Sequence, residues 1–283
     1  MSEGFFLNFS SKKIDLEKKV AVMGILNLTP DSFYDGGRYR TEKEILKRVE
    51  QMIEEGADII DIGGESTRPG SDRVSVEEEL RRTIPYLRKI RDLFDIPLSI
   101  DTYKAKVAKE AIEAGAEMVN DISGLRFDPE MAEVISSKNA SVVLMHIKGT
   151  PKNMQDNPFY ESLMDEIISY LRKSLEIALK AGIDFDRIVI DPGIGFGKTV
   201  EHNLFILKNL EELRILRRPI LIGVSRKSFI GKVLNLPVEE RLFGSLAATS
   251  VAVMNGARIV RCHDVRETRQ VVDLVDAILK SKV

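Results

Sequence analysis

Polar side chains that could bind a ligand or move a proton recur at corresponding places along this 283-residue chain. Each follows a short apolar run that is typical of a buried strand. One such residue alone is more often the cap of the next helix. Seven or eight of them at the ends of strands instead predict a shared site of carboxylates, amides and cations. In chain order these positions are Asn27, Gly63–Arg68, Asp101, Asn120, Asp121, His146, Asp191, Ser225–Lys227 and Arg261–His263.

A fold that unites so many strand ends is indicated by the alternation of short apolar and longer amphipathic runs. The predicted strands are Val20–Leu26, Asp58–Ile62, Pro97–Ile100, Glu117–Val119, Val142–Met145, Arg187–Ile190, Ile220–Gly223 and Arg258–Arg261. The predicted helices are Thr41–Glu55, Val76–Phe94, Lys104–Ala114, Pro129–Ser137, Tyr160–Ala181, Glu201–Leu210, Glu239–Asn255 and Arg266–Lys280. Eight such units predict an α/β fold, the (β/α)8 TIM barrel, with its chemistry on the loops after the strands. An open doubly wound sheet is the alternative.

Composition narrows the class of protein further. Hydrophobic residues make up 43% of the chain and charged residues 30%, which is enough for a large core. The formal net charge of −2 argues against nucleic acid as a partner. The single cysteine, Cys262, fits a reducing compartment, and no run of about 18 apolar residues suggests a membrane span or a signal peptide, so we expect a cytoplasmic protein. Without a linker, we expect one catalytic barrel over residues 20–283, preceded by an N-terminal extension, 1–19.

The glycine-rich segment Gly193–Thr199 invites a different interpretation, a nucleotide-binding loop. The phosphate-loop pattern would need glycine at position 192, where the chain has Pro192. We therefore expect a loop in which glycine lets the backbone approach a flat ligand closely.

Eight segments resemble, in the same order, the motifs of dihydropteroate synthases. The resemblance runs from about Val20 to the C-terminal helix. It departs from the family at Tyr34, where serine is common, and residues 1–19 match nothing in the family pattern. The segments are Met23–Gly37, Gly56–Ser71, Leu98–Thr102, Val119–Gly124, Met145–Pro158, Ile190–Thr199, Gly223–Gly231 and Arg261–Val265.

The resemblance implies an enzyme of folate biosynthesis that joins two small molecules. It would condense 6-hydroxymethyl-7,8-dihydropterin diphosphate with para-aminobenzoate, giving 7,8-dihydropteroate and diphosphate, with Mg²⁺ as cofactor. The family's habit, together with apolar residues on the last three helices, also suggests a homodimer.

For the pterin, the resemblance implies five residues, of which Asp101, Lys227 and Arg261 would be catalytic. Asp191 would accept the two adjacent N–H groups of the 2-amino-4-oxo edge, as carboxylates do with guanidinium. Asn120 would contact the neighbouring ring nitrogens, and Asp101 would lie beside the far ring. Lys227 would donate to the carbonyl edge, and Arg261 would stack over the ring.

For the diphosphate, the resemblance implies Asn27 as a ligand of Mg²⁺, and Arg261 with His263 as anion contacts. General-base catalysis by His263 is the less favoured reading, since an aromatic amine needs little help to attack a cationic centre. Histidines 146 and 202 are expected to be structural or exposed, and Asp121 to be a cap. The residues implied for para-aminobenzoate are Thr67, Arg68, Pro69, Phe196 and Ser228.

Two rival functions share parts of this pattern. A pterin-dependent methyltransferase domain would use a similar barrel and similar pterin contacts, but it would need no diphosphate site. The segments NLTPDSFYDGG, STRPGS and RCHD favour the synthase. A non-catalytic pterin-binding barrel would be expected to have lost some of the polar residues, and all are present: Asn27, Arg68, Asp101, Lys227 and Arg261.

Overall fold

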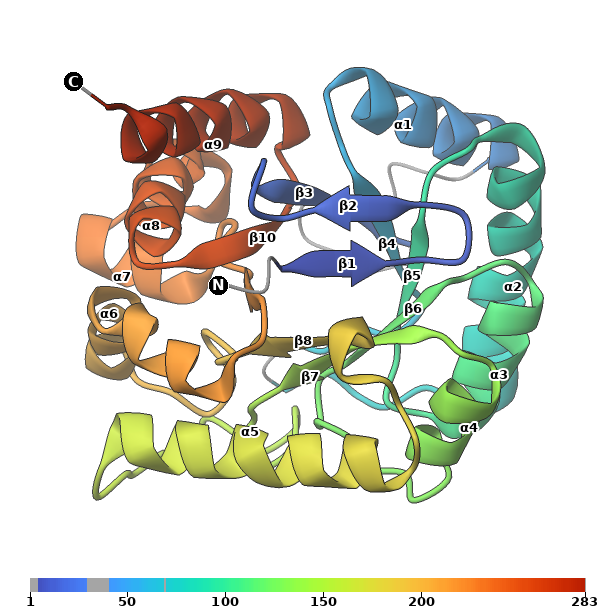
Figure 1. The fold of residues 1–283 in the computed structure, drawn as a ribbon, viewed down its shortest axis with the longest axis horizontal. Helices are drawn as coiled ribbons and strands as arrows, with labels where there is room; N and C mark the ends of the chain where they lie inside the picture. The colour runs from blue at the N-terminus through green and yellow to red at the C-terminus, as the bar shows by residue number, and fades with distance from the viewer. Residues whose placement is uncertain (1–4, 30–40, 69, 283) are drawn as a thin grey trace.

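The computed structural model describes residues 5–29, 41–68 and 70–282, and its centre is a closed barrel of parallel strands (Figure 1). Around the barrel the strand order is β10-β3-β4-β5-β6-β7-β8-β9. Closure confirms the predicted (β/α)8 barrel and excludes the open sheet. The strands are β3 (Ala21–Asn27), β4 (Ile59–Gly63), β5 (Leu98–Asp101), β6 (Met118–Asp121), β7 (Ser141–Met145), β8 (Ile188–Asp191), β9 (Ile220–Ile222) and β10 (Ala257–Cys262).

Helices surround the barrel, as Figure 1 shows. Those predicted from the sequence appear as α1 (Glu42–Glu54), α2 (Val76–Leu93), α3 (Ala105–Glu113), α4 (Met131–Ser137), α5 (Leu163–Lys180), α6 (Val200–Lys208), α8 (Leu242–Met254) and α9 (Val265–Lys280). Single 3-10 turns or short runs lie at η1 (Phe185–Arg187), η2 (Leu210–Leu216) and η3 (Val238–Glu240). No helix among the described residues is long and apolar enough to cross a membrane.

One helix was not expected. The connection after β9 forms α7 (Ser228–Leu234), so Ser228 is the first residue of a helix of its own rather than part of a turn before α8. Burial of Phe229 and Ile230 explains why this short segment is helical, and Asn235 ends it in the left-handed conformation at φ 55°. The start predicted for the next helix, Glu239, was too early, because that residue lies in η3.

The N-terminal extension forms a hairpin that covers one end of the barrel. Its strands, β1 (Phe6–Asn8) and β2 (Lys13–Asp15), pair antiparallel and lie in front of the barrel in Figure 1. The buried side chains of Leu7, Ile14 and Leu16 pack in one cluster with the inward-facing residues of the barrel strands. This end is the N-terminal one, since those residues stand near the starts of the strands.

Several barrel strands run further than the sequence predicted, and this difference positions the site. We expected Asp101, Asn120 and Asp191 to follow their strands, but they still belong to the ladder. Arg261 lies in β10, as the predicted strand Arg258–Arg261 had it. Asp101 is paired with Asn120, and Arg261 with Met23. Polarity of a side chain does not prevent its backbone from pairing, so these four polar groups are held by strands and not by loops.

Candidate active site

Alternation along the strands explains why the polar groups meet. The first inward-facing layer is apolar and packs on the hairpin: Met23, Ile59, Met118, Val143, Val189, Leu221 and Ile259. Side chains of a strand alternate between its two faces, so the residues two positions further along also face inward. Those positions form the second layer: Ile25, Asp61, Asn120, Met145, Asp191, Gly223 and Arg261. Asp101 follows Ser99 in the same way, and the C-terminal mouth of the barrel is therefore polar.

Arg261 is held by two carboxylates from neighbouring strands. Its Nε donates to Asp61 Oδ2 at 2.6 Å, and its Nη2 donates to Asp101 Oδ2 at 2.7 Å. Burial opposes the charge of the guanidinium, but the two carboxylates outweigh it and raise the pKa of Arg261 above its usual value. Arg261 therefore remains positively charged even though it lies in a buried site.

Asp61 was not among the site residues predicted from the sequence. This residue lies in the middle of β4, and it is completely buried. Asp61 could have been recognised as a carboxylate inside the apolar run ADIIDIGG, two residues before Gly63 and therefore on the same face of the strand. A buried carboxylate there requires a partner, and its partner is 200 positions away in the sequence.

Two carboxylate oxygens in the mouth lack a donor. Asp61 Oδ1 and Asp101 Oδ1 are buried, and neither has a hydrogen-bond partner among the described residues. Burial raises the pKa of Asp101 to about 7, against the attraction of Arg261. Unsatisfied buried acceptors are costly, so this pocket suits a ligand that brings N–H donors.

Asn120 and Asp121 are neighbours on β6 with different surroundings. The Asn120 amide faces the mouth, and its Nδ2 donates to Asp61 Oδ2 at 3.0 Å. The Asp121 side chain lies on the opposite face of the strand from Asn120, because successive side chains alternate. It accepts hydrogen bonds from Ser123 and from the backbone N–H of Leu125, all within 2.8 Å. Asp121 thus fixes the turn after β6.

Asp191 and Lys227 form the opposite side of the mouth. Asp191 Oδ1 accepts the backbone N–H of Gly193 at 2.6 Å. Burial raises the pKa of Asp191, and Lys227 opposes that shift. The Lys227 ammonium donates to the Ile194 carbonyl and lies 4.8 Å from the centroid of the Phe196 ring. Burial lowers the pKa of Lys227 to about 8.

The glycine-rich loop after β8 packs closely against protein backbone. A Cβ at Gly193, where φ is 69°, would lie 1.9 Å from the His146 carbonyl oxygen, and a Cβ at Gly197 would lie 2.5 Å from that of Lys148. Gly193 and Gly197 thus approach protein backbone, whereas the expected close approach of this loop to a flat ligand stays a prediction. They let two neighbouring loops touch, and Lys198 fastens them by donating to the Phe196 carbonyl at 3.0 Å and contacting His146 Nδ1 at 2.8 Å.

His263 lies beyond Arg261 at the end of β10. Its Nδ1 is 2.9 Å from Ser225 Oγ, whose oxygen also accepts the His263 backbone N–H at 3.2 Å. Burial, with repulsion from Arg261 and Arg68, lowers the pKa of His263 to about 3. The ring is therefore neutral at pH 7. The other two histidines have structural contacts: His146 is buried, and His202 Nδ1 accepts the Thr199 backbone N–H at the start of α6.

Asn27 ends β3 beside Asp101. A Cβ built on Gly63 would lie 3.5 Å from Asn27 Oδ1 and 3.9 Å from Asp101 Oδ2, so both oxygens flank the same glycine. Within the described ranges, no group of three or more His, Cys, Asp or Glu side chains could hold a metal ion.

The connection after β4 carries Thr67 and Arg68, both partly exposed. It is tied down by the Ser71 hydroxyl, which donates to the carbonyls of Ser66 at 2.5 Å and Arg68 at 2.8 Å. Beneath it, Tyr103 donates to Glu65 Oε1 at 2.6 Å. Pro69 lies outside the described residues, as do Tyr34 and the other residues of the first motif from position 30 onward.

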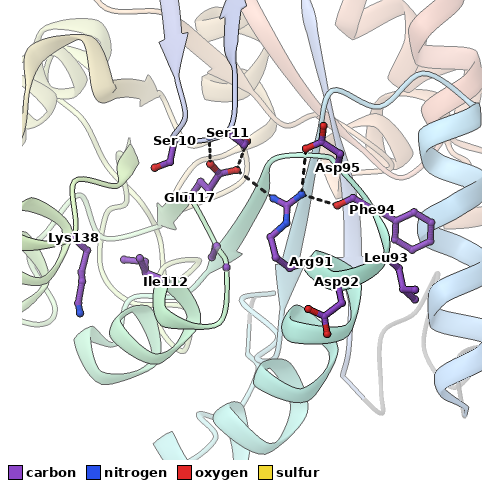
Figure 2. Close-up of a pocket in the computed structure, with 12 residues that line it drawn as sticks. Ser10, Ser11, Arg91, Asp92, Leu93, Phe94, Asp95, Ile112, Glu117 and Lys138 are labelled. Atoms are coloured by element: carbon purple, nitrogen blue, oxygen red, sulfur yellow. Dashed lines mark hydrogen bonds and ion pairs between the residues drawn. The ribbon is translucent and has the colours of Figure 1, made fainter.

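A surface pocket of about 840 Å³ lies at the other end of the barrel (Figure 2). Several of its polar groups bond to one another: Glu117 accepts the backbone N–H and the hydroxyl of Ser11 at 2.6 and 2.7 Å. Arg91 reaches the same carboxylate at 3.5 Å and donates to the Phe94 carbonyl at 2.6 Å. This pocket joins the hairpin to the barrel and contains none of the inward-facing polar residues.

The polar mouth and the closed barrel define a class, the barrel enzymes that place their chemistry at the C-terminal ends of the strands. Comparison with known proteins narrows the class. Residues 23–263 match the family described as pterin binding enzyme. A dihydropteroate synthase of Clostridium beijerinckii is 48% identical, over 97% of this chain and 100% of that protein.

Solved structures agree with the sequence comparison. The dihydropteroate synthase of Yersinia pestis, in complex with a sulfonamide drug, has a TM-score of 0.95 at 42% identity and covers 98% of this chain and 100% of its own. That of Xanthomonas albilineans with 4-aminobenzoic acid has a TM-score of 0.91 at 40% identity and covers 99% and 100%. The chain belongs to the pterin-binding enzyme family, among its dihydropteroate synthases, which are transferases.

Proposed function

We propose that the barrel mouth condenses 6-hydroxymethyl-7,8-dihydropterin diphosphate with para-aminobenzoate. The amine nitrogen bonds to the pterin methylene, the bond from that carbon to the diphosphate oxygen breaks, and the amine loses a proton. The observation that carries this proposal is a pair of buried carboxylate oxygens, Asp61 Oδ1 and Asp101 Oδ1, that no described residue supplies with a donor. A pterin, rich in N–H groups, is the kind of ligand that would satisfy them.

In this proposal Asp191 accepts the two N–H groups of the pyrimidine edge, and Asn120 contacts the adjoining ring nitrogens. Lys227 donates to the carbonyl edge, for which its position beside Asp191 is suited. Asp101 stabilises the positive charge that develops near the methylene as diphosphate leaves. Arg261, the permanent cation, covers the ring and faces the departing anion.

The diphosphate would lie between Arg261, His263 and Asn27. Mg²⁺ takes few protein ligands and often travels with phosphates, so one amide oxygen, Asn27 Oδ1, fits an ion that the substrate brings. The metal would supply charge neutralisation on the diphosphate.

The para-aminobenzoate site would be formed by residues around the mouth. Phe196 offers an apolar face beside the Lys227 ammonium, and it packs in a cluster that includes Met145. The remaining residues of this proposed site lie on two loops: Thr67, Arg68 and Pro69 after β4, and Ser228 at the start of α7.

We assign His263 to anion binding and not to general-base catalysis. A pKa of about 3 makes the ring a weak base at neutral pH, while its N–H can still donate to phosphate oxygens. His263→Gln should keep activity within about tenfold, since one hydrogen bond is worth roughly 1 kcal/mol, whereas Arg261→Gln should lose far more. A loss near a thousandfold in His263→Gln with unchanged diphosphate affinity would instead identify a base.

A homodimer would bury an apolar face on the last helices. Helix α8 contains no charged residue, and its Phe243 side chain is 80% exposed. Leu274 and Ile278 on the adjacent α9 are also exposed, which is unusual for a monomer. We further place the enzyme in the cytoplasm, where the free, buried Cys262 would stay reduced, and fractionation of cells tests that placement.

The decisive experiment is a diphosphate-release assay with purified protein. Release should require both the pterin diphosphate and para-aminobenzoate, and chelation of Mg²⁺ should abolish it. Binding of pterin without any release would identify a non-catalytic barrel. Release without incorporation of the amine would refute the condensation.

A further inference from the structure

We propose that Lys104 is a positioning residue that holds both ends of the connection between β4 and α2, and so sets the geometry of the para-aminobenzoate site. The inference rests on the proposed function, because Thr67 and Arg68 of that connection are the residues proposed there to contact para-aminobenzoate. Lys104 lies three residues after Asp101 and directly precedes α3. One short segment of chain thus carries a carboxylate of the mouth and the cation that holds the connection.

Each N–H group of the Lys104 ammonium has an acceptor. The ammonium donates to Glu65 Oε2, to the Val74 carbonyl at 2.8 Å and to Glu79 Oε2 at 2.5 Å. Glu65 stands at the start of the connection, Val74 stands near its end, and Glu79 belongs to α2. A lysine has three N–H donors, and all of them are used here. One side chain therefore ties the two ends of the connection together.

Burial makes these contacts hard to exchange for water. Glu65 and Glu79 are both buried, and the Lys104 side chain is 13% exposed. Tyr103 donates to Glu65 Oε1 at 2.6 Å, whereas no described residue supplies a donor to Glu79 Oε1. Two buried carboxylates thus share one cation, and separation from it would leave each of them with fewer partners. Both ends of the connection therefore stay at Lys104.

The fixed ends limit where the residues between them can lie. Thr67 is two positions from Glu65, and an extended chain spans at most about 3.6 Å per residue, so Thr67 stays within roughly 7 Å of its anchor. Arg68, the next residue, is confined in the same way. The residues proposed for the pterin lie outside this connection. We therefore expect Lys104 to affect the second substrate and not the first.

Lys104→Met removes the three donors and keeps the length of the side chain. At saturating pterin diphosphate, the KM for para-aminobenzoate should rise at least tenfold with little change in kcat. The affinity for 6-hydroxymethylpterin, measured by calorimetry, should stay within threefold of wild type. A purely structural role would lower the free energy of unfolding and leave both of these quantities unchanged.

Lys106→Met is the matched control. Lys106 lies on α3 and pairs with Glu77 of the same helix α2 at 4.0 Å, but the two side chains are 64% and 77% exposed. An exposed pair of this kind contributes little to the position of either helix. The control should therefore keep the wild-type KM for para-aminobenzoate.

A second variant covers loss of folding, because Lys104→Met leaves two buried carboxylates without a cation. If circular dichroism shows that Lys104→Met is unfolded, Glu65→Leu decides. Glu65→Leu releases the start of the connection and leaves Lys104 paired with Glu79, so the same rise in KM is expected. An unchanged KM for para-aminobenzoate, or an equal weakening of both substrates, overturns the inference. A wild-type protein that does not consume para-aminobenzoate refutes the proposed function instead.

Discussion

Burial shifts the ionisable side chains of the barrel mouth toward their neutral forms. The pKa of Asp101 rises to about 7, that of Lys227 falls to about 8, and that of His263 falls to about 3. Arg261 is the exception, because two carboxylates lie within 2.7 Å of its guanidinium. Burial thus weakens the charge of several groups in the mouth, whereas Arg261 remains a cation, an arrangement suited to a flat ring with an anionic tail.

We expect Asp191→Asn to abolish measurable pterin binding while the fold stays intact. The amide would set a donor against a donor at the pyrimidine edge, a mismatch of roughly 2–4 kcal/mol when buried. Calorimetry with a pterin analogue measures this, and Asp121→Asn, which alters only the turn after β6, is the control. An affinity within threefold of wild type would remove Asp191 from the site.

His263 should lower acid stability. Its folded pKa of about 3 lies below the unfolded value of 6.5, so the unfolded chain binds more protons between these pH values, and stability falls as pH drops through that window. At pH 5 the loss reaches at most about 2 kcal/mol, less for a partly exposed ring. Denaturant unfolding at pH 7.5 and pH 5 should therefore show a smaller loss in His263→Gln than in wild type. Equal losses would contradict the assigned cause.

At the scale of elements, the hairpin closes the barrel end that carries no chemistry. Leu16 has no exposed surface and packs in the cluster that includes Met23 and Ile59. Leu16→Ala should cost about 2–5 kcal/mol of unfolding free energy, by lost burial and an unfilled cavity. Urea unfolding measures the loss, and Lys12→Ala, on an exposed residue of the same hairpin, should cost almost nothing. Equal unfolding free energies of the two variants would show that packing of the hairpin on the barrel contributes little to stability.

The loop after β4 should respond to diphosphate. Arg68 lies close enough to His263 to lower its pKa, so an anion bound beside His263 would also attract Arg68 and order Thr67 next to it. Diphosphate with Mg²⁺ should therefore raise the affinity for para-aminobenzoate at least tenfold, as calorimetry can measure. Asn27→Ala should weaken this enhancement. The same affinity with and without diphosphate would show that the second site forms independently.

At the scale of the whole molecule, the apolar face of α8 and α9 predicts the assembly. Sedimentation should give a mass of twice the 31.8 kDa of one chain. Phe243→Asp should yield monomers, because it buries a charge in the contact. Phe159→Asp is the matched control, since Phe159 is 68% exposed and precedes α5, away from this face. A monomeric wild type, or dissociation by both variants, would refute the proposed interface.

The repeating architecture and several residues of the candidate site could be predicted from the sequence alone. Alternation of apolar and amphipathic runs is a local property, so eight strand–helix units could be read without the fold, and Asp101, Asn120, Asp191 and Arg261 could be placed at strand ends. The motifs around these residues resemble those of dihydropteroate synthases and so indicated the family. These features depend on residues that are close together along the chain, so they can be recognised in the sequence.

Only the tertiary structure decided which groups touch. The Asp61–Arg261 ion pair joins residues 200 positions apart, and the period of one strand cannot reveal a partner on another. The same limit applies to the hairpin, whose apolar residues can be explained only by the barrel end that they cover. It also applies to Gly193, where the His146 carbonyl of the adjacent loop leaves no room for a Cβ. Local sequence sets which residues face inward, whereas closure of the barrel sets their distances, because it brings the first and last strands together.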